Sequence, residues 1–339
     1  MQDNFIKDKF ARIIRTNSVN WGNLRYCSAG KDELHSIWVR DACLCAPAIQ
    51  KMDLSSMTFN LINLYLKSLN STLEPIMVFD TIHPWRRIIY ANIRSWIKIP
   101  CWSKIHFDER LPLIGYPGRL DSHLYILYAI QFCSEEEKSI IMTNYKTTID
   151  AMIAWYDKYK PTGKYITQPE ERRFRGCQIA GTYADMNFLY SYVLSTFTSK
   201  KHLSLDVFNC SRGGLRARLE DSEEMFCCNS TLFAMQIGMI KKQKYEKLPP
   251  IITNSSFVKA MYADLQLVHK KTTLGNELCN DFLDLGLLYE YNQNGESKYT
   301  LTAAIMYMMI VEYRDRSHKE DIETDKKNRN NEKKLNRPL

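Results

Sequence analysis

The pattern of apolar and polar residues along the chain is mainly helical. Between Leu54 and Leu69, apolar side chains recur every three or four residues, which places them on one face of an α-helix. A second long helix is predicted over Glu135–Tyr159, where Ser134 suits the N-cap and Glu137 stands at the capping-box position. Further helices are predicted over residues 38–50, 121–132, 182–196, 221–242, 255–269 and 300–314.

Two regions depart from this helical pattern. Prolines at positions 75, 84, 100, 112 and 117 break any long helix between residues 74 and 119, where Ile88–Ile93 and Trp96–Ile99 are predicted to be short strands. From Arg316 onward the chain is rich in charged residues and asparagine and has almost no apolar ones, which predicts a disordered tail. The expected organisation is one helical domain over residues 1–315, followed by a charged tail over residues 316–339.

Composition favours a large soluble protein of a reducing compartment. Of 339 residues, 45% are hydrophobic and 25% are charged, which is ordinary for a globular domain with a sizeable core. No stretch approaches the roughly 20 apolar residues of a membrane span, and residues 1–16 lack the apolar centre of a signal peptide. The ten cysteines include no Cys-x-x-Cys pair. We therefore expect free thiols, a cytoplasmic location and no membrane partner.

Several kinds of chemistry find no motif in the chain. The net charge of +8 is scattered rather than gathered in one stripe, so a nucleic-acid partner is not expected. There is no Gly-x-x-x-x-Gly-Lys or Gly-x-Gly-x-x-Gly phosphate loop and no Gly-x-Ser-x-Gly elbow. No His-Glu-x-x-His motif or Cys/His cluster indicates a metal. The sequence therefore predicts neither a metal nor a cofactor.

Three segments each place an aspartate at the start of a predicted helix. They are residues 35–42 with Arg40 and Asp41, residues 115–125 with Asp121, and residues 181–187 with Asp185. An Arg-Asp pair offers planar donors beside an acceptor, which suits the binding of hydroxyl groups. A carboxylate at a helix start is also stabilised by the helix dipole. One open interpretation is thus an unrelated helical protein in which all three aspartates are simple helix caps.

Taken in order, these segments resemble the glucoamylase family and its relatives, the glycogen-debranching glucosidases. Residues 38–41 resemble the Trp-x-Arg-Asp signature, and residues 118–122 look like the second characteristic helix start. Residues 183–185 fall where these enzymes carry an aromatic residue followed by the general acid, and residues 287–291 resemble the Leu-x-Glu-x-Tyr turn that holds the base. The resemblance implies an all-α, six-hairpin (α/α)6 toroid with a few short strands in its loops.

The resemblance also implies a role for each matching residue. Asp185 would be the general acid and Glu290 the general base of an inverting glycosidase, whose two carboxyl groups stand about 6.5–9.5 Å apart to admit water. Arg40 and Asp41 would hold the hydroxyls of the terminal sugar. The other substrate-binding residues would be Trp38, Tyr116, Arg119, Asp121 and Tyr183, of which the three aromatic rings suit stacking on sugars.

The implied function is hydrolysis that removes glucose from α-linked glucans or small α-glucosides, so the expected partner is a carbohydrate. Two departures from the family pattern keep an alternative open. Residues 34–37 are Leu, His, Ser and Ile where the family usually has tyrosines, and Ala184 replaces a glutamate found in some relatives. The alternative is a catalytically inactive carbohydrate-binding or scaffold protein on the same toroid. Glu170 and Glu171 are rival acids, although a solvated charge cluster is their simpler interpretation.

Overall fold

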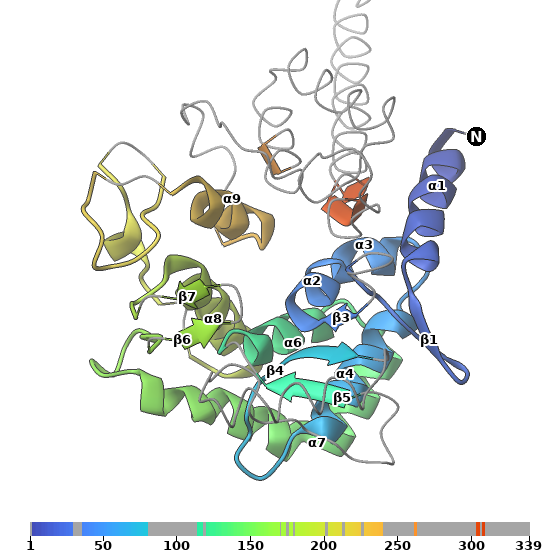
Figure 1. The fold of residues 1–339 in the computed structure, drawn as a ribbon, viewed down its shortest axis with the longest axis horizontal. Coiled ribbons are helices and arrows are strands. Elements are labelled where there is room, and N and C mark those ends of the chain that lie inside the picture. Colours follow the sequence, from blue (N-terminus) through green and yellow to red (C-terminus); the bar gives the residue numbers. More distant parts are fainter. Residues whose placement is uncertain are drawn as a thin grey trace, which may run out of the picture.

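The computed structural model describes a mainly helical chain (Figure 1). The described residues are 2–29, 36–80, 114–117, 120–169, 171–173, 176–178, 180–200, 203–211, 214–224, 227–239, 261–262, 303–305 and 307–308. The predicted strands at Ile88–Ile93 and Trp96–Ile99 lie outside the described residues, as do the tail and most of the last two predicted helices.

Helices form most of the described part. They are α1 (Gln2–Thr16), α2 (Val39–Leu44), α3 (Ala46–Lys51), α4 (Ser56–Ser68), α6 (Ser122–Ile130), α7 (Glu135–Trp155), α8 (Ala184–Phe197) and α9 (Cys228–Gln236), with short 3-10 helices at Tyr156–Tyr159 and Asp206–Phe208. The strands are β1 (Val19–Trp21), β2 (Leu24–Tyr26), β3 (Ile37–Trp38), β4 (Ile76–Asp80), β5 (Ile114–Pro117), β6 (Glu171–Arg173) and β7 (Gly176–Gln178). The predicted mainly helical class with a few short strands is confirmed. Within the described residues, no helix is long and apolar enough to cross a membrane.

Helix α6 is the centre of the helical layer. Every residue from Ser122 to Ile130 is buried, and the helix packs against α2, α4, α7 and α8. A helix that is apolar on all sides is stable only when it is enclosed on all sides. Helix α7 follows it and exposes one polar face, as an outer helix should. The capping box predicted at the start of α7 is confirmed, because Ser134 Oγ accepts from Glu137 N at 3.2 Å and Glu137 Oε2 accepts from Ser134 N at 2.8 Å.

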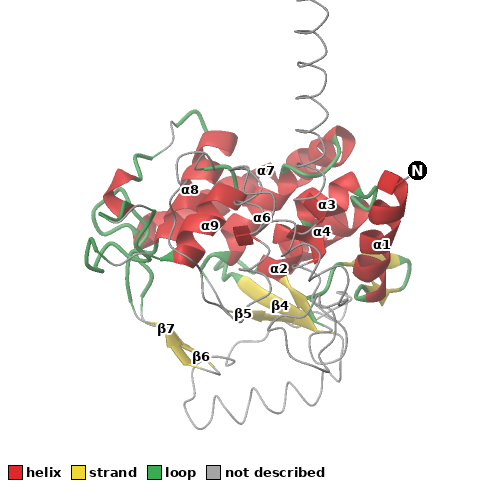
Figure 2. Ribbon diagram, turned by 90° about the horizontal axis from the view of Figure 1, so that it is seen from above, coloured by secondary structure: helices red, strands yellow, loops and turns green. Residues whose placement is uncertain are grey.

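The short strands gather on one side of the helices (Figure 2). Strands β3, β4 and β5 form an antiparallel sheet in that order, and its register places Trp38, Val78 and Tyr116 in one cross-strand row. Strands β6 and β7 form a hairpin on the same side, and β1 pairs with β2 in a separate hairpin. Helix α2 begins directly after β3, and α6 and α8 begin a few residues after β5 and β7. All three helices therefore start on the strand side.

A buried polar network fixes the start of α6 to its neighbours. The Tyr65 hydroxyl, from α4, accepts from Ile76 N at 3.2 Å and lies 2.7 Å from His123 Nδ1. His123 Nε2 lies 2.9 Å from the Leu73 carbonyl oxygen. Burial lowers the pKa of His123 to about 4, and the nearby Lys158 charge adds to this effect, whereas the bond to Leu73 opposes it. The ring is thus neutral, and its partners assign the proton to Nε2, so that Nδ1 accepts from Tyr65.

Several cysteines lie in the core as free thiols. Cys27, Cys43, Cys45 and Cys133 are buried and unbridged. Burial raises the pKa of Cys43 and of Cys45 far above the ordinary value, and it raises the pKa of Cys133 to about 12. The thiols of Cys43, Cys45 and Cys133 remain protonated at neutral pH and behave as small apolar side chains. Within the described residues, the prediction of free thiols is confirmed.

Two predicted helices have different boundaries in the structure. The helix predicted over residues 38–50 is two short helices, α2 and α3, and Trp38 precedes them in β3 because its main chain pairs with β4. The helix predicted from Asp221 begins only at Cys228, with α9. Residues 214–224 instead bond to distant main-chain and side-chain groups, which the helical spacing of apolar residues does not reveal.

Candidate active site

The start of α2 carries a paired arginine and aspartate. Arg40 Nε donates to Asp41 Oδ1 at 2.9 Å. The Asp41 side chain is 9% exposed, whereas the Arg40 side chain is 40% exposed. The carboxylate is therefore nearly buried and holds a guanidinium that reaches solvent. Such a pair presents fixed donors to a ligand while the neighbouring carboxylate balances their charge. Trp38 is half-buried and occupies the N-cap of this helix without a side-chain capping bond.

The start of α6 places Asp121 at the edge of the aromatic core. Asp121 occupies the N-cap, but its side chain makes no capping hydrogen bond to the helix. The preceding carbonyl group, at Leu120, accepts a hydrogen bond from the Tyr156 hydroxyl. Burial raises the pKa of Tyr156, and the charges of Tyr65 and Asp121 add to the shift. The Asp121 charge thus raises the pKa of two buried phenols, those of Tyr156 and Tyr65.

The start of α8 holds Asp185 in the first turn. Tyr183 is the N-cap residue and makes no side-chain capping bond, and Asp185 Oδ1 accepts from Met186 N at 2.8 Å. Asp185 is half-buried. Its carboxylate therefore satisfies one amide of its own first turn and keeps part of its surface accessible. Asp185 thus bonds to an amide of its own helix, as the interpretation of the aspartates as helix caps requires. The Asp121 side chain makes no such bond, so this interpretation fails for Asp121.

Residues 215–221, which we call the clamp, hold the chain that leads into α8. Ala184 N donates to Ala217 O at 2.8 Å, and Leu219 N donates to Thr182 O at 2.9 Å. Tyr183 and Arg218 face each other in an antiparallel bridge between these two bonds. On the other side of the same segment, Gly181 and Gln168 exchange two main-chain hydrogen bonds of 2.8 and 2.9 Å. The approach to Asp185 is thus a central strand-like segment with a partner on each side.

Charged side chains complete the clamp. Glu220 accepts from Thr182 N at 3.0 Å with each carboxylate oxygen. Arg218 is fixed by Asp221, which accepts from Arg218 Nε at 2.9 Å and from Arg218 N at 3.0 Å. A Cβ atom on Gly181 would lie 2.9 Å from Arg218 Cδ and 3.1 Å from Glu220 Oε2, so a larger residue there requires these side chains to shift. Sequence analysis did not single out Glu220 or Arg218, because Glu220 bonds to Thr182, 38 residues away, and Arg218 pairs through its main chain with Tyr183.

Two of the predicted site residues, Arg119 and Glu290, lie outside the described residues. Tyr116 is described through its main chain, which shares the cross-strand row with Trp38. Helices α2 and α8 both pack against α6. Trp38, Arg40, Asp41, Asp121, Tyr183 and Asp185 therefore lie at or directly before the starts of three helices that pack together.

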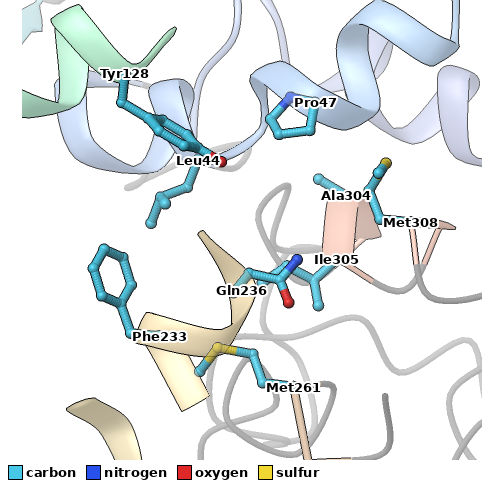
Figure 3. Close-up of a pocket in the computed structure, with 9 residues that line it drawn as sticks. All are labelled: Leu44, Pro47, Tyr128, Phe233, Gln236, Met261, Ala304, Ile305 and Met308. Carbon is cyan, nitrogen blue, oxygen red and sulfur yellow. The ribbon is translucent and has the colours of Figure 1, made fainter. Parts of the chain in front are cut away.

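A small pocket lies at the other end of these helices (Figure 3). Leu44 and Tyr128 contribute from the last turns of α2 and α6, and Phe233 and Gln236 contribute from α9. The remaining lining residues are Pro47, Met261, Ala304, Ile305 and Met308. The lining has no titratable group except the Tyr128 phenol, so it offers no acid or base. Within the described residues, no three His, Cys, Asp or Glu side chains come together to hold a metal.

Comparison with known proteins identifies a shared fold. No family model matches the chain, and no curated protein matches its sequence. Solved structures of glycosidases do match in three dimensions. A wild-type glycosidase superposes with a TM-score of 0.51 at 8% identity, over 92% of this chain and 96% of its own. A single-residue variant of a glycosidase gives 0.53 at 8% identity with the same coverage, and a variant in complex with glucose gives 0.50 at 7% identity. The chain therefore shares its overall fold with these solved structures.

Proposed function

We propose that the protein is an inverting glycoside hydrolase that removes glucose from α-linked glucans or small α-glucosides. The observation that carries this proposal is the common side on which α2, α6 and α8 begin. The Arg40–Asp41 pair and the half-buried Asp185 stand at two of these helix starts, in a fold shared with a solved glycosidase along 92% of the chain. A polar face of this kind supplies both sugar-binding groups and a proton donor.

We propose the (α/α)6 toroid as the architecture behind this arrangement. Such a ring pairs an inner helix with an outer one and points the inner helices in one direction. Helix α6 is buried on every side and α7 exposes one face, which is the inner–outer pairing that a ring of hairpins requires. Helices α2 and α8 flank α6 and begin on its side of the layer, as further inner helices would.

In this mechanism Asp185 protonates the leaving oxygen, and Glu290 activates the water that attacks from the opposite face of the sugar. The Arg40 guanidinium, which donates a hydrogen bond to Asp41, binds hydroxyls of the terminal glucose. Arg119 and Asp121 add further polar contacts, and the rings of Trp38, Tyr116 and Tyr183 provide apolar faces for sugar stacking. One structural neighbour is a glycosidase variant solved with glucose, which supports glucose as the sugar to test first.

The test is a product assay with maltose, maltotriose, isomaltose, trehalose and glycogen. We expect glucose release by the wild type and a loss of about 100- to 10,000-fold in kcat for Asp185→Asn and for Glu290→Gln, because each removes one half of the acid–base pair. The matched control is Asp150→Asn, which changes an exposed carboxylate on α7 that pairs with Lys146. This control should keep full activity.

The stereochemistry of the released glucose tests the inverting step. Proton NMR taken within the first minutes of reaction on glycogen or maltotriose, whose leaving group is not glucose, should show β-glucose, since water attacks from the face opposite to the leaving group. Initial release of α-glucose would rule out inversion. Absence of glucose from every substrate would contradict the hydrolase itself.

A carbohydrate-binding protein without turnover is the second candidate. Two sequence features favour it: Ala184 stands before Asp185 in place of a glutamate, and residues 34–37 lack the family's tyrosines. This candidate predicts that one of the same sugars raises the melting temperature while no product forms. Arg40→Ala should abolish that stabilisation, and Asp185→Asn should leave it intact.

We further propose a reducing, cytoplasmic location for this carbohydrate-active protein. The support is the presence of six free cysteines in the described residues, four of them within the core around α2, α3 and α6. Disulfides are rare where glutathione keeps thiols reduced. Fluorescence microscopy of the tagged full chain in its own cell type tests the location.

A further inference from the structure

Glu220 links a side chain of the clamp to the segment that leads into Asp185. Main-chain bonds fix Thr182 O and Ala184 N, whereas the described acceptor of the Thr182 amide is the Glu220 carboxylate. Thr182 also bonds through its hydroxyl to Thr167 Oγ1 at 2.9 Å. The chain three residues before Asp185 is thus held by main-chain bonds, by the Thr167 hydroxyl and by one acidic side chain from a distant loop.

The chemistry of Glu220 fits a holding role. Burial opposes its ionisation, but hydrogen bonds from Thr182 and from its own amide, together with the Arg218 charge, outweigh that cost and lower its pKa. The residue is exposed, yet both oxygens of its carboxylate accept a hydrogen bond from the main-chain amide of Thr182. A charged acceptor makes a stronger hydrogen bond to an amide than a neutral one does.

The packing around Gly181 shows how little freedom this contact has. The space that a Cβ would need is taken by Arg218 Cδ and Glu220 Oε2. Asp221 fixes Arg218 in turn, so a fixed arginine and the Glu220 carboxylate both lie against Gly181. These neighbours therefore restrict the position of the Glu220 carboxylate. The contact of that carboxylate with Thr182 lies three residues before Asp185.

From this arrangement we infer that Glu220 is a positioning residue for Asp185 and acts through the Thr182 amide. This inference rests on the proposed function, in which Asp185 is the general acid. Proton transfer requires hydrogen-bond distance between the acid and the leaving oxygen, and a displacement of about 1 Å can cost about 100-fold in rate. Glu220 touches neither substrate nor reacting atoms in this role.

Three substitutions at Glu220 separate geometry from charge. Glu220→Ala removes the acceptor, and Glu220→Asp keeps the charge on a side chain one methylene shorter, which no longer reaches the amide. Glu220→Gln keeps the length and an acceptor oxygen without the charge. We expect kcat on the best substrate to fall about 10- to 100-fold in the Ala and Asp variants, with KM unchanged, and to stay within about threefold of wild type in the Gln variant.

Two further measurements accompany the kinetics. Hydrogen exchange of the peptide that contains Thr182, followed by mass spectrometry, should be faster in the Ala and Asp variants than in the Gln variant. The matched control is Glu223→Ala, which removes an exposed carboxylate from the same loop whose only described contacts use its main-chain oxygen. Its kinetics and exchange should equal those of the wild type.

The outcomes separate this role from the proposed function. If the wild type is active and Glu220→Ala exchanges faster at Thr182 while kcat is unchanged, the positioning role is wrong and the hydrolase stands. An equal loss of kcat in the Gln and Ala variants also overturns it, since the charge and not the bond would then be required. A wild type that hydrolyses none of the glucosides overturns both together. Should the Ala variant not fold, the Asp and Gln variants give the same decision.

Discussion

Helices α6 and α8 both begin at a turn with an aspartate, but different forces hold the two starts. At α6 the holding groups are buried side chains, namely Tyr65, His123 and Tyr156. At α8 they are main-chain hydrogen bonds to the clamp, the exposed carboxylate of Glu220 and the buried amide of Asn187, which donates to Tyr183 O at 2.8 Å. A buried polar network is costly to disturb, because each group left without a partner has no water to replace it. The start of α6 therefore depends on buried side chains, whereas the start of α8 combines one buried amide with main-chain bonds and an exposed carboxylate.

The largest effect that sharpens this contrast is expected from Tyr65→Phe. The change deprives Ile76 N of its acceptor and His123 Nδ1 of its donor, both in the core. Each buried group left unsatisfied costs about 1–3 kcal/mol, so we expect a loss of about 2–6 kcal/mol in the free energy of unfolding. Urea denaturation followed by circular dichroism measures it.

The control for this prediction is Tyr128→Phe, on α6 itself. Among the described residues the Tyr128 hydroxyl makes no hydrogen bond, so its removal should change the free energy of unfolding by well under about 1 kcal/mol. Equal losses in the two variants would show that the network does not hold the start of α6.

The next effect is a dependence of stability on pH. His123 has a pKa of about 4 in the folded protein, below the value of 6.5 that it has without burial. Between these two values the unfolded chain binds a proton that the folded chain does not. The free energy of unfolding should consequently fall by about 3 kcal/mol as the pH drops from about 6.5 to about 4, and His123 should add no further loss below that.

The variant His123→Gln isolates this contribution. Glutamine keeps one donor and one acceptor but does not titrate, so its unfolding free energy should change less over the same pH range. The difference between the two curves is the share of His123. Parallel curves would mean that His123 takes up its proton over the same pH range in the folded and the unfolded chain, so that burial does not lower its pKa.

The smallest effect on stability is expected at the clamp, from Gly181→Ala. The added Cβ meets Arg218 Cδ at 2.9 Å, so the arginine must shift. We expect a loss of about 1–3 kcal/mol in unfolding free energy, typical of an overpacked site. Combining it with Arg218→Ala frees the space and should recover part of that loss, which a double-mutant cycle by thermal melting quantifies. Strictly additive losses would show that Arg218 is not the obstacle.

Local signals were enough to predict much of the helical layer. The capping box at Ser134 and Glu137 and the apolar spacing from Leu54 to Leu69 depend on residues three or four positions apart, and both predictions are confirmed by α7 and α4. The starts of α6 and α8 lie within two residues of their predicted positions for the same reason. Such contacts can be read directly from neighbouring sequence.

The clamp could not be predicted in this way. Its bonds join residues 181–184 to residues 217–220, which stand directly before the helix predicted over residues 221–242. Asp221 looked like a helix start, whereas it in fact fixes Arg218. Trp38 was likewise assigned to a helix because its pairing partner, Val78, is 40 residues further on. Roles that depend on distant partners need the folded chain.

The rates at which the buried thiols react with a labelling reagent report how often the surrounding structure opens. An alkylating reagent attacks the thiolate, and Cys43, Cys45 and Cys133 are shielded from it by burial and by their raised pKa values. Each is therefore labelled only during the moments when its surroundings open. Cys43 and Cys45 report on the junction of α2 and α3, and Cys133 reports on the turn between α6 and α7. Mass-spectrometric labelling rates at these sites would compare how often the two places come apart, without any added probe.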